Sequence, residues 1–459
     1  MSHHQPDPNK SVTLTIDGIS VTVPEGTRIL EAAKKVNVSI PTLCEHPELC
    51  KRALCRICVV EADGRGKLIA ACANDVWEGV SIVTTNQRLL NIRKTIIELI
   101  LANHPQDCLS CIRNKKCELQ SLALSFGVGG SLFDNDAERQ SPQIESETLV
   151  RDMDKCVKCG RCVEVCQEVQ TIRAINTSHR SYEYEISTPY KQALKDGPCV
   201  FCGSCAAVCP VGAIYEHDQT AEVRAALNDS SRKVIAQISP SLAVAVNDEL
   251  ALAADTITTG KLTAAIKLLG FDKVFDANIA VNAVNSELAN EVQERKNDGR
   301  TTLPVISGCS AGVANFVKNF YPDLANHLTT VKSPRQIFVS FIKSCYANQA
   351  GINLSSVTSV FFVPCIAQKY GAGVKDKNDF ALTAGELARM LKLAGIVIET
   401  LPEEPFNSVD VDLPKQNSPV KKETIHGYAQ AREVMEAIRE GKCDAEWVEI
   451  LNCQEHHSC

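Results

Sequence analysis

Hydrophobic and polar residues alternate near the start of the chain in a pattern typical of paired strands. Residues 12–23 alternate on both sides of an Asp-Gly pair, which tolerates the positive φ of a tight turn and so predicts a β-hairpin. Residues 27–36 carry apolar side chains at helical spacing and predict a short helix. A longer helical pattern covers residues 86–102, and the polar stretch 128–148, interrupted by Gly, Ser and Pro, predicts a linker.

The pattern changes after residue 233, where short β-branched runs alternate with amphipathic helices. Such alternation favours parallel sheets covered by helices. Helical spacing is clearest in residues 241–253 and 426–440, while the polar, proline-containing residues 403–424 predict a loop. The predicted strands are Lys233–Ile238, Lys273–Ala277, Thr302–Ile306, Val357–Pro364 and Glu446–Leu451.

Length and charge narrow the class of protein. A chain of 459 residues is expected to form several domains, because a single core rarely grows beyond about 250–300 residues. Lys and Arg total 48 against 55 Asp and Glu, with no basic tract, which argues against nucleic acid as a partner. No apolar run reaches the roughly 18–20 residues of a membrane span, and the polar N-terminus lacks the apolar segment of a secretory signal. We therefore expect a cytoplasmic protein without a membrane span.

Cysteine is the most informative residue type in this sequence. The chain holds 22 cysteines, and 15 of them, with one histidine, form four closely spaced patterns within the first 209 residues. Tight Cys-x-x-Cys runs suit metal clusters better than disulfides. Iron–sulfur clusters transfer single electrons and are damaged by oxygen, so the patterns predict an electron carrier from an anaerobic host.

The first pattern predicts a [2Fe–2S] cluster, because four thiolates supply two ligands to each of two irons. Its ligands would be Cys44, Cys55, Cys58 and Cys72. Cys50, between the first two, is interpreted as a bystander. The spacing, with the hairpin and helix before it, resembles the β-grasp [2Fe–2S] ferredoxin domain at the start of complex I-like and hydrogenase subunits. The alternative is a set of four unrelated buried cysteines.

The second pattern replaces one thiolate by an imidazole. A set of one histidine and three cysteines can hold a [4Fe–4S] cluster, and here it consists of His104, Cys108, Cys111 and Cys117. A neutral imidazole makes the cluster less negative than a thiolate does, so the reduction potential is expected to rise, as in Rieske centres. A structural zinc ion is the alternative, because zinc also takes one His and three Cys.

Two further runs share the spacing Cys-x2-Cys-x2-Cys-x3-Cys of bacterial two-cluster ferredoxins, in which the fourth cysteine of each run binds the other cluster. One [4Fe–4S] cluster would therefore take Cys156, Cys159, Cys162 and Cys209. The other would take Cys199, Cys202, Cys205 and Cys166. Pro210 follows the second run as in those ferredoxins, whereas Gln167 replaces the proline after the first.

The order of these motifs resembles the N-terminal part of [FeFe]-hydrogenases, and later segments extend the resemblance over nearly all of the chain. Those segments are Gln-Ile-Ser-Pro from Gln237, Gly-Phe-Asp-Lys-Val-Phe-Asp from Gly270, Lys-Ser-Pro-Arg-Gln from Lys332 and Thr-Ile-His-Gly from Thr424. The resemblance implies a multidomain protein of α+β and α/β class. Its parts would be a β-grasp [2Fe–2S] ferredoxin domain (10–88), a [4Fe–4S] segment with one histidine and three cysteine ligands (89–127), a linker (128–148), a two-[4Fe–4S] ferredoxin domain (149–220) and a truncated hydrogenase-like α/β domain with parallel sheets (230–459).

The first two catalytic motifs of that family are altered here. In the family, a [4Fe–4S] cubane and a two-iron unit, joined through one cysteine, form the H-cluster. The motif Thr-Ser-Cys-Cys-Pro-Gly-Trp becomes Ser-Gly-Cys-Ser-Ala-Gly-Val, with Cys309 at the proton-transfer thiol and Ser310 at a cubane ligand. The motif Pro-Cys-Thr-Ala-Lys-Lys keeps the ligand Cys365 but has Gln368 in place of the lysine that would contact the two-iron unit.

The remaining catalytic motifs differ more strongly from those of the family. The Gly-Gly-Val-Met-Glu stretch is absent, and residues 403–424 stand where the family has a much longer segment. The motif Ala-Cys-Pro-Gly-Gly-Cys reads Asn-Cys-Gln-Glu-His-His, with His457 in place of the bridging cysteine. Together these changes predict a degenerate site with no H-cluster and no catalytic residues, so the chain is not expected to make or split hydrogen.

An ordinary [4Fe–4S] cluster in the same pocket stays open as a prediction. Its ligands would be Cys309, Cys365, Cys453 and Cys459, with His456 or His457 as substitutes. The alternative is that these thiols pack as small hydrophobic residues, which is our interpretation for Cys345 and Cys443. The sequence thus predicts one [2Fe–2S] cluster and three [4Fe–4S] clusters, with a fourth [4Fe–4S] cluster as the open alternative.

The resemblance implies an electron-relay subunit of a soluble multi-subunit oxidoreductase. Related subunits pair with an NADH-binding flavoprotein subunit and a thioredoxin-like [2Fe–2S] subunit, and they exchange electrons with ferredoxin or another redox module. No Gly-x-Gly-x-x-Gly follows a predicted strand, so a partner would bind the nucleotide. The alternatives are an active [FeFe]-hydrogenase with an atypical H-cluster, and a redox or hydrogen sensor.

Overall fold

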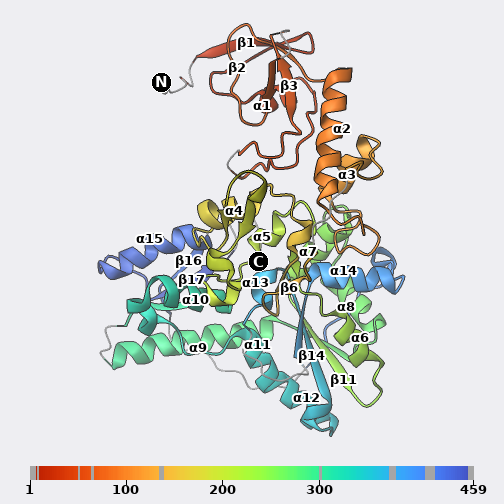
Figure 1. Cartoon of the computed structure of the whole chain (residues 1–459). Helices are drawn as coiled ribbons and strands as arrows, with labels where there is room; N and C mark the ends of the chain where they lie inside the picture. Colours follow the sequence, from red (N-terminus) through yellow and green to blue (C-terminus); the bar gives the residue numbers. More distant parts are fainter. Residues whose placement is uncertain are drawn as a thin grey trace.

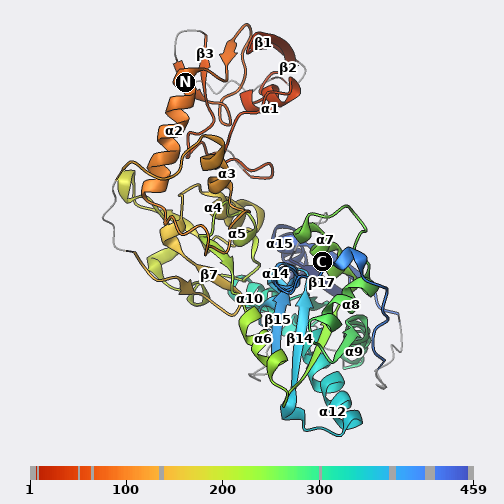
Figure 2. The same cartoon turned by 90° about the vertical axis from the view of Figure 1, so that its right-hand side faces the viewer.

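The computed structural model arranges the chain as modules that follow one another in sequence order (Figure 1). A small sheet and a long helix lie at one end, and two parallel sheets with their helices lie at the other. The turned view shows the N-terminal module projecting from this larger body (Figure 2). The structure describes residues 7, 10–49, 52–63, 67–133, 139–298, 302–371, 379–408 and 419–452.

The N-terminal module is a mixed five-stranded sheet of order β2-β1-β5-β3-β4 with one short helix. Its first two strands form the predicted hairpin, in which Ile16 pairs with Ile19 across Asp17 (φ 49°) and Gly18 (φ 83°). Strand β5 pairs in parallel with β1, and α1 packs into the same hydrophobic core. The elements are β1 (Ser11–Ile16), β2 (Ile19–Pro24), α1 (Ile29–Lys35), β3 (Val59–Ala62), β4 (Lys67–Ala70) and β5 (Ser81–Val83).

Two helices follow this sheet. Helix α2 (Gln87–Ala102) covers the predicted helical stretch, and Asn86 caps it by accepting a hydrogen bond from the Leu89 backbone N–H at 2.8 Å. Helix α3 (Glu118–Ser125) comes after a loop. Both helices contribute to a hydrophobic core that also takes side chains from the sheet module before them and the module after them.

The next module has short helices and antiparallel strands of a ferredoxin-like fold. Strand β6 pairs with β7, so the stretch predicted as a linker ends in a paired strand. The strands are β6 (Gln143–Ile144), β7 (Leu149–Arg151), β8 (Asn176–Ser178), β9 (Glu185–Ser187) and β10 (Ile214–Glu216). The helical turns are η1 (Met153–Lys155), α4 (Arg161–Glu164), η2 (Val165–Val169), η3 (Ser181–Glu183), η4 (Pro189–Lys191), η5 (Leu194–Asp196) and α5 (Ser204–Ala207).

The first sheet of the C-terminal body is parallel throughout, in the order β12-β11-β14-β15. Every residue of β14 is buried, as expected for a parallel strand covered on both faces. The strands are β11 (Lys233–Ile238), β12 (Lys273–Asp276), β14 (Val357–Val363) and β15 (Asp379–Thr383). The helices around it are α6 (Thr220–Asn228), α7 (Pro240–Leu250), α8 (Thr259–Leu268), α11 (Pro334–Ile337), η7 (Phe338–Lys343), α12 (Ser344–Ala350), η8 (Leu354–Ser356), α14 (Ala384–Leu393) and η9 (Ile398–Thr400).

A second parallel sheet has the order β13-β17-β16. The loop prediction for residues 403–424 is wrong at its end, because β16 begins at Lys422 and pairs with β17 along its whole length. The strands are β13 (Val305–Gly308), β16 (Lys422–His426) and β17 (Trp447–Leu451). The helices are α9 (Asn278–Asn297), α10 (Ala311–Phe320), η6 (Pro322–His327) and α15 (Gly427–Arg439). Helix α13 (Ile366–Lys369) follows β14 and contacts β14 and β15 of the first sheet.

The ferredoxin-like module and the second parallel sheet share one hydrophobic core. Phe201 of the module stacks on Tyr370 of the body, with ring centroids 4.3 Å apart. Gly312 in α10 approaches the Val200 carbonyl so closely that a methyl group at this position would overlap the oxygen. This packing fixes the ferredoxin-like module against the C-terminal body.

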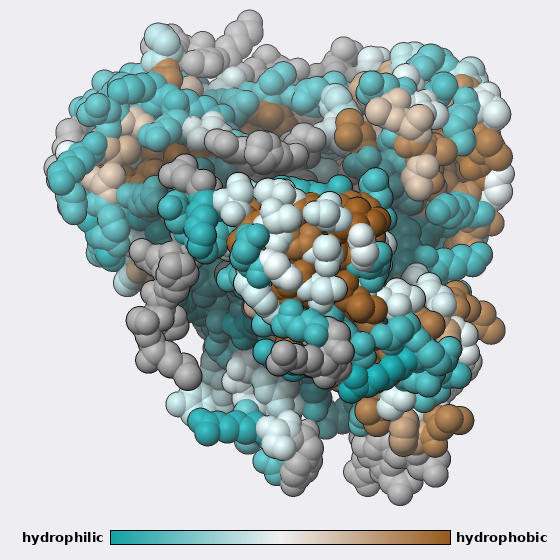
Figure 3. All heavy atoms as spheres, turned by 90° about the horizontal axis from the view of Figure 1, so that it is seen from above, coloured by the Kyte–Doolittle hydropathy of each residue, from teal (hydrophilic) through white to brown (hydrophobic). Residues whose placement is uncertain are grey.

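The N-terminal module carries apolar side chains on its outer surface. Seen from above, it faces the viewer and shows hydrophobic atoms among polar ones (Figure 3). Its exposed large hydrophobic side chains include Ile19, Leu68 and Trp77. Among the described residues, no helix combines the length and the apolar composition needed to cross a bilayer.

Candidate iron–sulfur sites

The four cysteines of the first pattern converge at one edge of the N-terminal sheet. The Cys58 and Cys72 sulfur atoms lie 3.3 Å apart, and both residues are almost fully buried. The Cys72 thiol lowers the pKa of Cys58 to about 7. Hydrogen bonds with Cys55 and then Cys72 lower the pKa of the Cys44 thiol. These contacts link all four thiols into one group, as a [2Fe–2S] site requires.

A buried arginine holds the loop around Cys58. Arg93 of α2 donates to the carbonyl oxygens of Ile57 at 3.2 Å and Val59 at 2.7 Å, on either side of the cysteine. It also donates to the Thr84 carbonyl at 2.9 Å. Sequence reasoning missed this contact, because the spacing between Arg93 and the cysteine motif carries no pattern.

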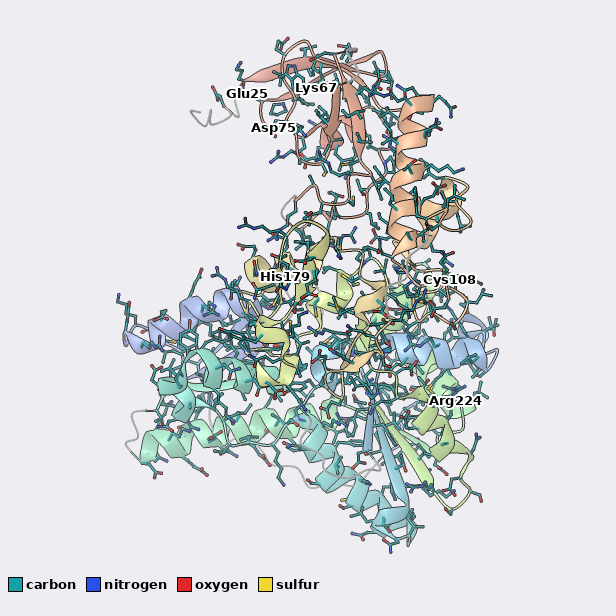
Figure 4. The ribbon with its side chains drawn as sticks, viewed as in Figure 1. Glu25, Lys67, Asp75, Cys108, His179 and Arg224 are labelled. Carbon is teal, nitrogen blue, oxygen red and sulfur yellow. The ribbon has the colours of Figure 1, made fainter. Side chains whose placement is uncertain are left out.

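The His104 ring lies buried beside the loop of the three cysteines. Its Nδ1 atom has no hydrogen-bond partner, and burial lowers the pKa of His104, which keeps the imidazole in the neutral form that binds metals. Burial raises the pKa of the Cys117 thiol, and Cys111 and Cys108 raise it further, so the three thiols lie near one another. Cys108, labelled in Figure 4, lies below α2 and α3.

This donor set suits a cluster. Zinc needs its ligands around one point at about 2.0–2.3 Å, and in the described part of the chain no group of three or more His, Cys, Asp or Glu side chains has that arrangement. In a [4Fe–4S] cluster each ligand binds a different iron, so the ligands stand apart. The orphaned Nδ1 atom and the nearby thiols fit the cluster interpretation, and a zinc ion held by the same four residues stays the alternative.

The third site is a cavity lined by four cysteines. Cys156, Cys159 and Cys162 come from the first run, and Cys209 comes from the second. Burial, with a smaller contribution from Cys209, raises the pKa of Cys156 to about 11 and that of Cys159 to about 12. Thiolates crowded in this way would repel one another unless iron neutralised their charge, and four such sulfur atoms around one cavity fit a [4Fe–4S] cluster.

The fourth site pairs the second run with the last cysteine of the first. Burial raises the pKa of the Cys199 thiol, and Cys202 and Cys166 raise it further. Burial also raises the pKa of Cys166 to about 11, and among the cysteines Cys202 is the one that adds to the shift. Cys205 lies with these three. Cys209 therefore lies beside the first run and Cys166 beside the second, and the crossed ligand assignment of the ferredoxin pattern stays a prediction.

The C-terminal pocket differs from these four sites. Cys309 follows β13 and Cys365 follows β14. Burial raises the pKa of Cys309 to about 12, and the nearby Cys365 thiol contributes to this rise. Cys365 and Cys202 line one cavity of about 780 Å³. The other residues predicted for this pocket, Cys453, His456, His457 and Cys459, lie outside the described residues, as does Cys50 near the first site.

A hydrogen-bond network surrounds Ser310, which the sequence analysis predicts to stand in place of a cubane ligand. Ser310 accepts a hydrogen bond from the Asn452 side-chain amide at 2.5 Å and another from the Gly312 backbone N–H at 3.2 Å. Asn452 in turn accepts a hydrogen bond from the Tyr428 hydroxyl at 2.7 Å. The Ser310 hydroxyl is therefore committed to capping α10, and sequence reasoning found the substitution without its partners.

A buried ion pair lies close to Cys365. Lys369 donates to both carboxylate oxygens of Glu386, at 2.7 and 2.8 Å, and to the His217 carbonyl at 2.5 Å. Both charged side chains are at most 1% exposed. Glu386 also caps α14 by accepting from the Thr383 backbone N–H. The pair thus joins the end of the ferredoxin-like module to the C-terminal body.

Four family models match the chain in the order of its modules. They are the 2Fe-2S iron-sulfur cluster binding domain (residues 9–87), the NADH-ubiquinone oxidoreductase-G iron-sulfur binding region (93–131), the NADH-quinone oxidoreductase subunit 3, ferredoxin-like domain (146–215) and, for residues 232–418, the C-terminal domain of the iron only hydrogenase large subunit. The fold and these matches define an iron–sulfur electron-transfer protein with a hydrogenase-like domain.

Two curated relatives match most of the chain. The NADP-reducing hydrogenase subunit HndD of Solidesulfovibrio fructosivorans is 37% identical over 414 residues, 86% of this chain and 71% of the relative. Iron hydrogenase 1 of Clostridium pasteurianum is 31% identical over 404 residues, 85% of this chain and 69% of the relative. The chain therefore belongs to the iron-only hydrogenase large-subunit family, as its motifs implied. The NADPH-Fe(3+) oxidoreductase subunit alpha of Geobacter sulfurreducens is 34% identical over 203 residues, 44% of this chain and 24% of the relative.

Proposed function

We propose that the chain is the electron-transfer subunit of an oxidoreductase complex, with one [2Fe–2S] and three [4Fe–4S] clusters and no H-cluster. The clusters supply one-electron transfer when bound, and the chain's own residues hold them and exclude water from them. The observation that carries the proposal is a contrast. Four ligand sets are assembled, whereas the Ser310 hydroxyl is committed to hydrogen bonds where the family has a cubane ligand.

The proposed ligands are those that the sequence predicts. The [2Fe–2S] cluster takes the set around Cys58 and Cys72, and the histidine-ligated [4Fe–4S] cluster takes His104 with its three cysteines. The two remaining [4Fe–4S] clusters take the crossed sets, in which Cys209 joins the first run and Cys166 joins the second. Because all four sets are buried or partly buried, protein groups replace much of the water around each cluster.

The relatives support a place in a complex. HndD is by name a subunit of an NADP-reducing hydrogenase, and the Geobacter protein is a subunit of an NADPH-Fe(3+) oxidoreductase. We propose that the partners of the chain are an NADH-binding flavoprotein subunit and a thioredoxin-like [2Fe–2S] subunit, and that the chain exchanges electrons with ferredoxin or another redox module. The complex would work in the cytoplasm, and the flavoprotein would bind the nucleotide.

Iron content tests the number of clusters. We expect anaerobically reconstituted protein to bind about 14 irons per chain, two for the first cluster and four for each of the others. A fifth cluster at Cys309, Cys365, Cys453 and Cys459 would raise the value to about 18 irons. Iron and acid-labile sulfide would be measured together on the full chain, and a Cys365→Ala variant is the matched control. Equal iron in the variant and the parent protein would exclude the fifth cluster.

Hydrogen turnover tests the absence of the H-cluster. The reconstituted chain, mixed with a synthetic two-iron precursor and reduced with dithionite, is expected to show reduced-cluster signals in EPR spectra and no hydrogen evolution. The physical reason is that Ser310 replaces a ligand and Gln368 replaces the lysine that would contact the two-iron unit. Hydrogen evolution above that of dithionite alone would contradict the proposal and favour the active-hydrogenase alternative.

A further inference from the structure

The Arg161 side chain lies where three of the four ligand sets meet. Arg161 stands between Cys159 and Cys162 in the chain and begins α4. It is 5% exposed, which is unusual for an arginine and demands partners for its charge and its five N–H groups.

Its acceptors are the chain neighbours of ligands from different sets. One terminal nitrogen donates to the carbonyl of Glu45, which follows Cys44 of the [2Fe–2S] set, at 2.7 Å. The two terminal nitrogens donate to the carboxylate of Glu118, which follows Cys117 of the histidine-containing set, at 2.6 and 2.7 Å. A longer contact of 3.4 Å reaches the carbonyl of Val208.

Val208 precedes Cys209, so this last contact belongs to the set in which Arg161 itself lies. One guanidinium thus contacts the loop of the [2Fe–2S] set and helix α3, which follows the last cysteine of the histidine-containing set. It also joins the two chain segments that supply Cys156, Cys159, Cys162 and Cys209. A planar, five-donor fork suits such a junction, whereas the point charge of a lysine does not.

Other contacts at the same junction support this arrangement. The Glu118 backbone N–H donates to the Pro210 carbonyl at 2.9 Å, which joins the residue after Cys117 to the residue after Cys209. Arg52 pairs with Glu164, which ties the [2Fe–2S] loop to α4. Side chains from the three modules also share one hydrophobic core, which includes Cys55, Cys117, Cys156 and Cys209.

Arg161 also carries a charge and one N–H group that its protein acceptors leave unused. A guanidinium stays protonated in proteins even when it is buried, and Glu118 supplies the counter-charge in an ion pair of 2.6 Å. The Nε atom is buried and has no hydrogen-bond partner in the structure. A sulfur of a bound cluster or thiolate is a suitable acceptor for this N–H, and hydrogen bonds to cluster sulfur help to set reduction potentials.

We propose that Arg161 is a positioning residue that holds the [2Fe–2S] cluster, the histidine-ligated [4Fe–4S] cluster and the Cys156–Cys209 cluster in one fixed array, and that its charge tunes their potentials. The inference rests on the proposed electron-transfer function and assigns one residue to the coupling of its clusters. Electron transfer between centres slows steeply with distance, so a residue that fixes three clusters at once sets the speed at which electrons pass among them.

The test separates geometry from charge. Arg161→Gln and Arg161→Lys would be made in the full chain, reconstituted anaerobically, and compared with the parent protein in iron content, EPR spectra and redox titrations. Arg161→Gln is expected to keep its irons, lose the magnetic interaction between the reduced [2Fe–2S] cluster and its neighbours, and lower the cluster potentials. Arg161→Lys is expected to restore the potentials and leave the magnetic interaction weakened.

A matched control accounts for the general loss of a buried arginine. Arg295 is 7% exposed and likewise binds one carboxylate, that of Glu291, and several backbone carbonyls, but it lies in the C-terminal body. Arg295→Gln should leave the magnetic interaction and the potentials unchanged. A third variant, Glu118→Ala, removes a half-exposed acceptor and is expected to weaken only the coupling to the histidine-ligated cluster.

The outcomes distinguish this inference from the proposed function. An Arg161→Gln protein with parental magnetic interaction and potentials would overturn the positioning role, as would an Arg295→Gln protein that changes as much as Arg161→Gln does. If Arg161→Gln cannot be produced folded, parental behaviour of both Arg161→Lys and Glu118→Ala would overturn it equally. A parent protein that binds no clusters would instead contradict the proposed function.

Discussion

A double variant Cys166→Ala/Cys199→Ala is expected to lose one [4Fe–4S] cluster, whereas Cys156→Ala/Cys166→Ala damages two. The reason is the crossed arrangement of the ferredoxin-like module, in which Cys166 belongs to the first run in sequence but lies with Cys199, Cys202 and Cys205 in space. In the first variant both changes fall on one site, and the site lined by Cys156 and Cys209 keeps all of its ligands.

The measurement compares the two variants side by side. Iron content would fall by about four irons per chain in the first variant, and EPR spectra of the reduced protein would keep the signal of the undamaged ferredoxin-type cluster. In the second variant both ferredoxin-type signals would change. The reverse result, with two damaged clusters in Cys166→Ala/Cys199→Ala, would mean that each run binds its own cluster. A Cys345→Ala variant, outside every motif, is the control for cysteine loss.

Lys369→Met is expected to destabilise the chain by about 3–5 kcal/mol, the usual cost of leaving one partner of a buried ion pair without its counter-charge. Without Lys369, the fully buried Glu386 carboxylate would have no counter-charge. Burial already raises the pKa of Glu386, and Lys369 opposes that rise. The His217 carbonyl would lose its donor as well. For a body of this size, the temperature of unfolding should fall by roughly 10 °C.

Two further variants test whether the unpaired charge of Glu386 causes the loss of stability in Lys369→Met. Lys369→Met/Glu386→Gln removes both charges and keeps an oxygen to cap α14, so it should recover much of the lost stability. Lys233→Met breaks a half-exposed pair with Asp272 and should change the unfolding temperature little. Unfolding would be followed by circular dichroism under anaerobic conditions. Equal losses in the single and the double variant would point to packing instead of charge.

The sequence predicted the elements whose pattern is strong and local. The hairpin around Asp17 and Gly18, the helix after Asn86 and the buried strand β11 are confirmed in the structure. Local patterns predicted strands at the edges of sheets less well. The first three residues of β16 were predicted as loop, because the pairing of β16 with β17 depends on a partner more than twenty residues away and its own side chains are largely exposed.

In the candidate sites, too, local sequence patterns were informative and contacts between distant residues were not predicted. Cysteine spacing is a local signal, and it indicated the ligand sets, including the exchange of Cys166 and Cys209, that the structure brings together. The residues that support those sets have no such signal. Arg161, Arg93 and Lys369 act through carbonyls and carboxylates far away in sequence, so their roles appear only when the chain is folded. A single sequence could show that Ser310 replaces a ligand, but not that Asn452 would bind it.

The ferredoxin-like module and the C-terminal body share one hydrophobic core, and this limits which parts of the chain can be lost during evolution. Val200 and Phe201 are neighbours of Cys199 and Cys202, and their apolar surfaces are covered by Gly312 and Tyr370 of the body. A deletion that removed the body would expose this surface and open one wall of the cluster site. Under the proposed function, selection for electron transfer alone is therefore enough to preserve the fold of the C-terminal body.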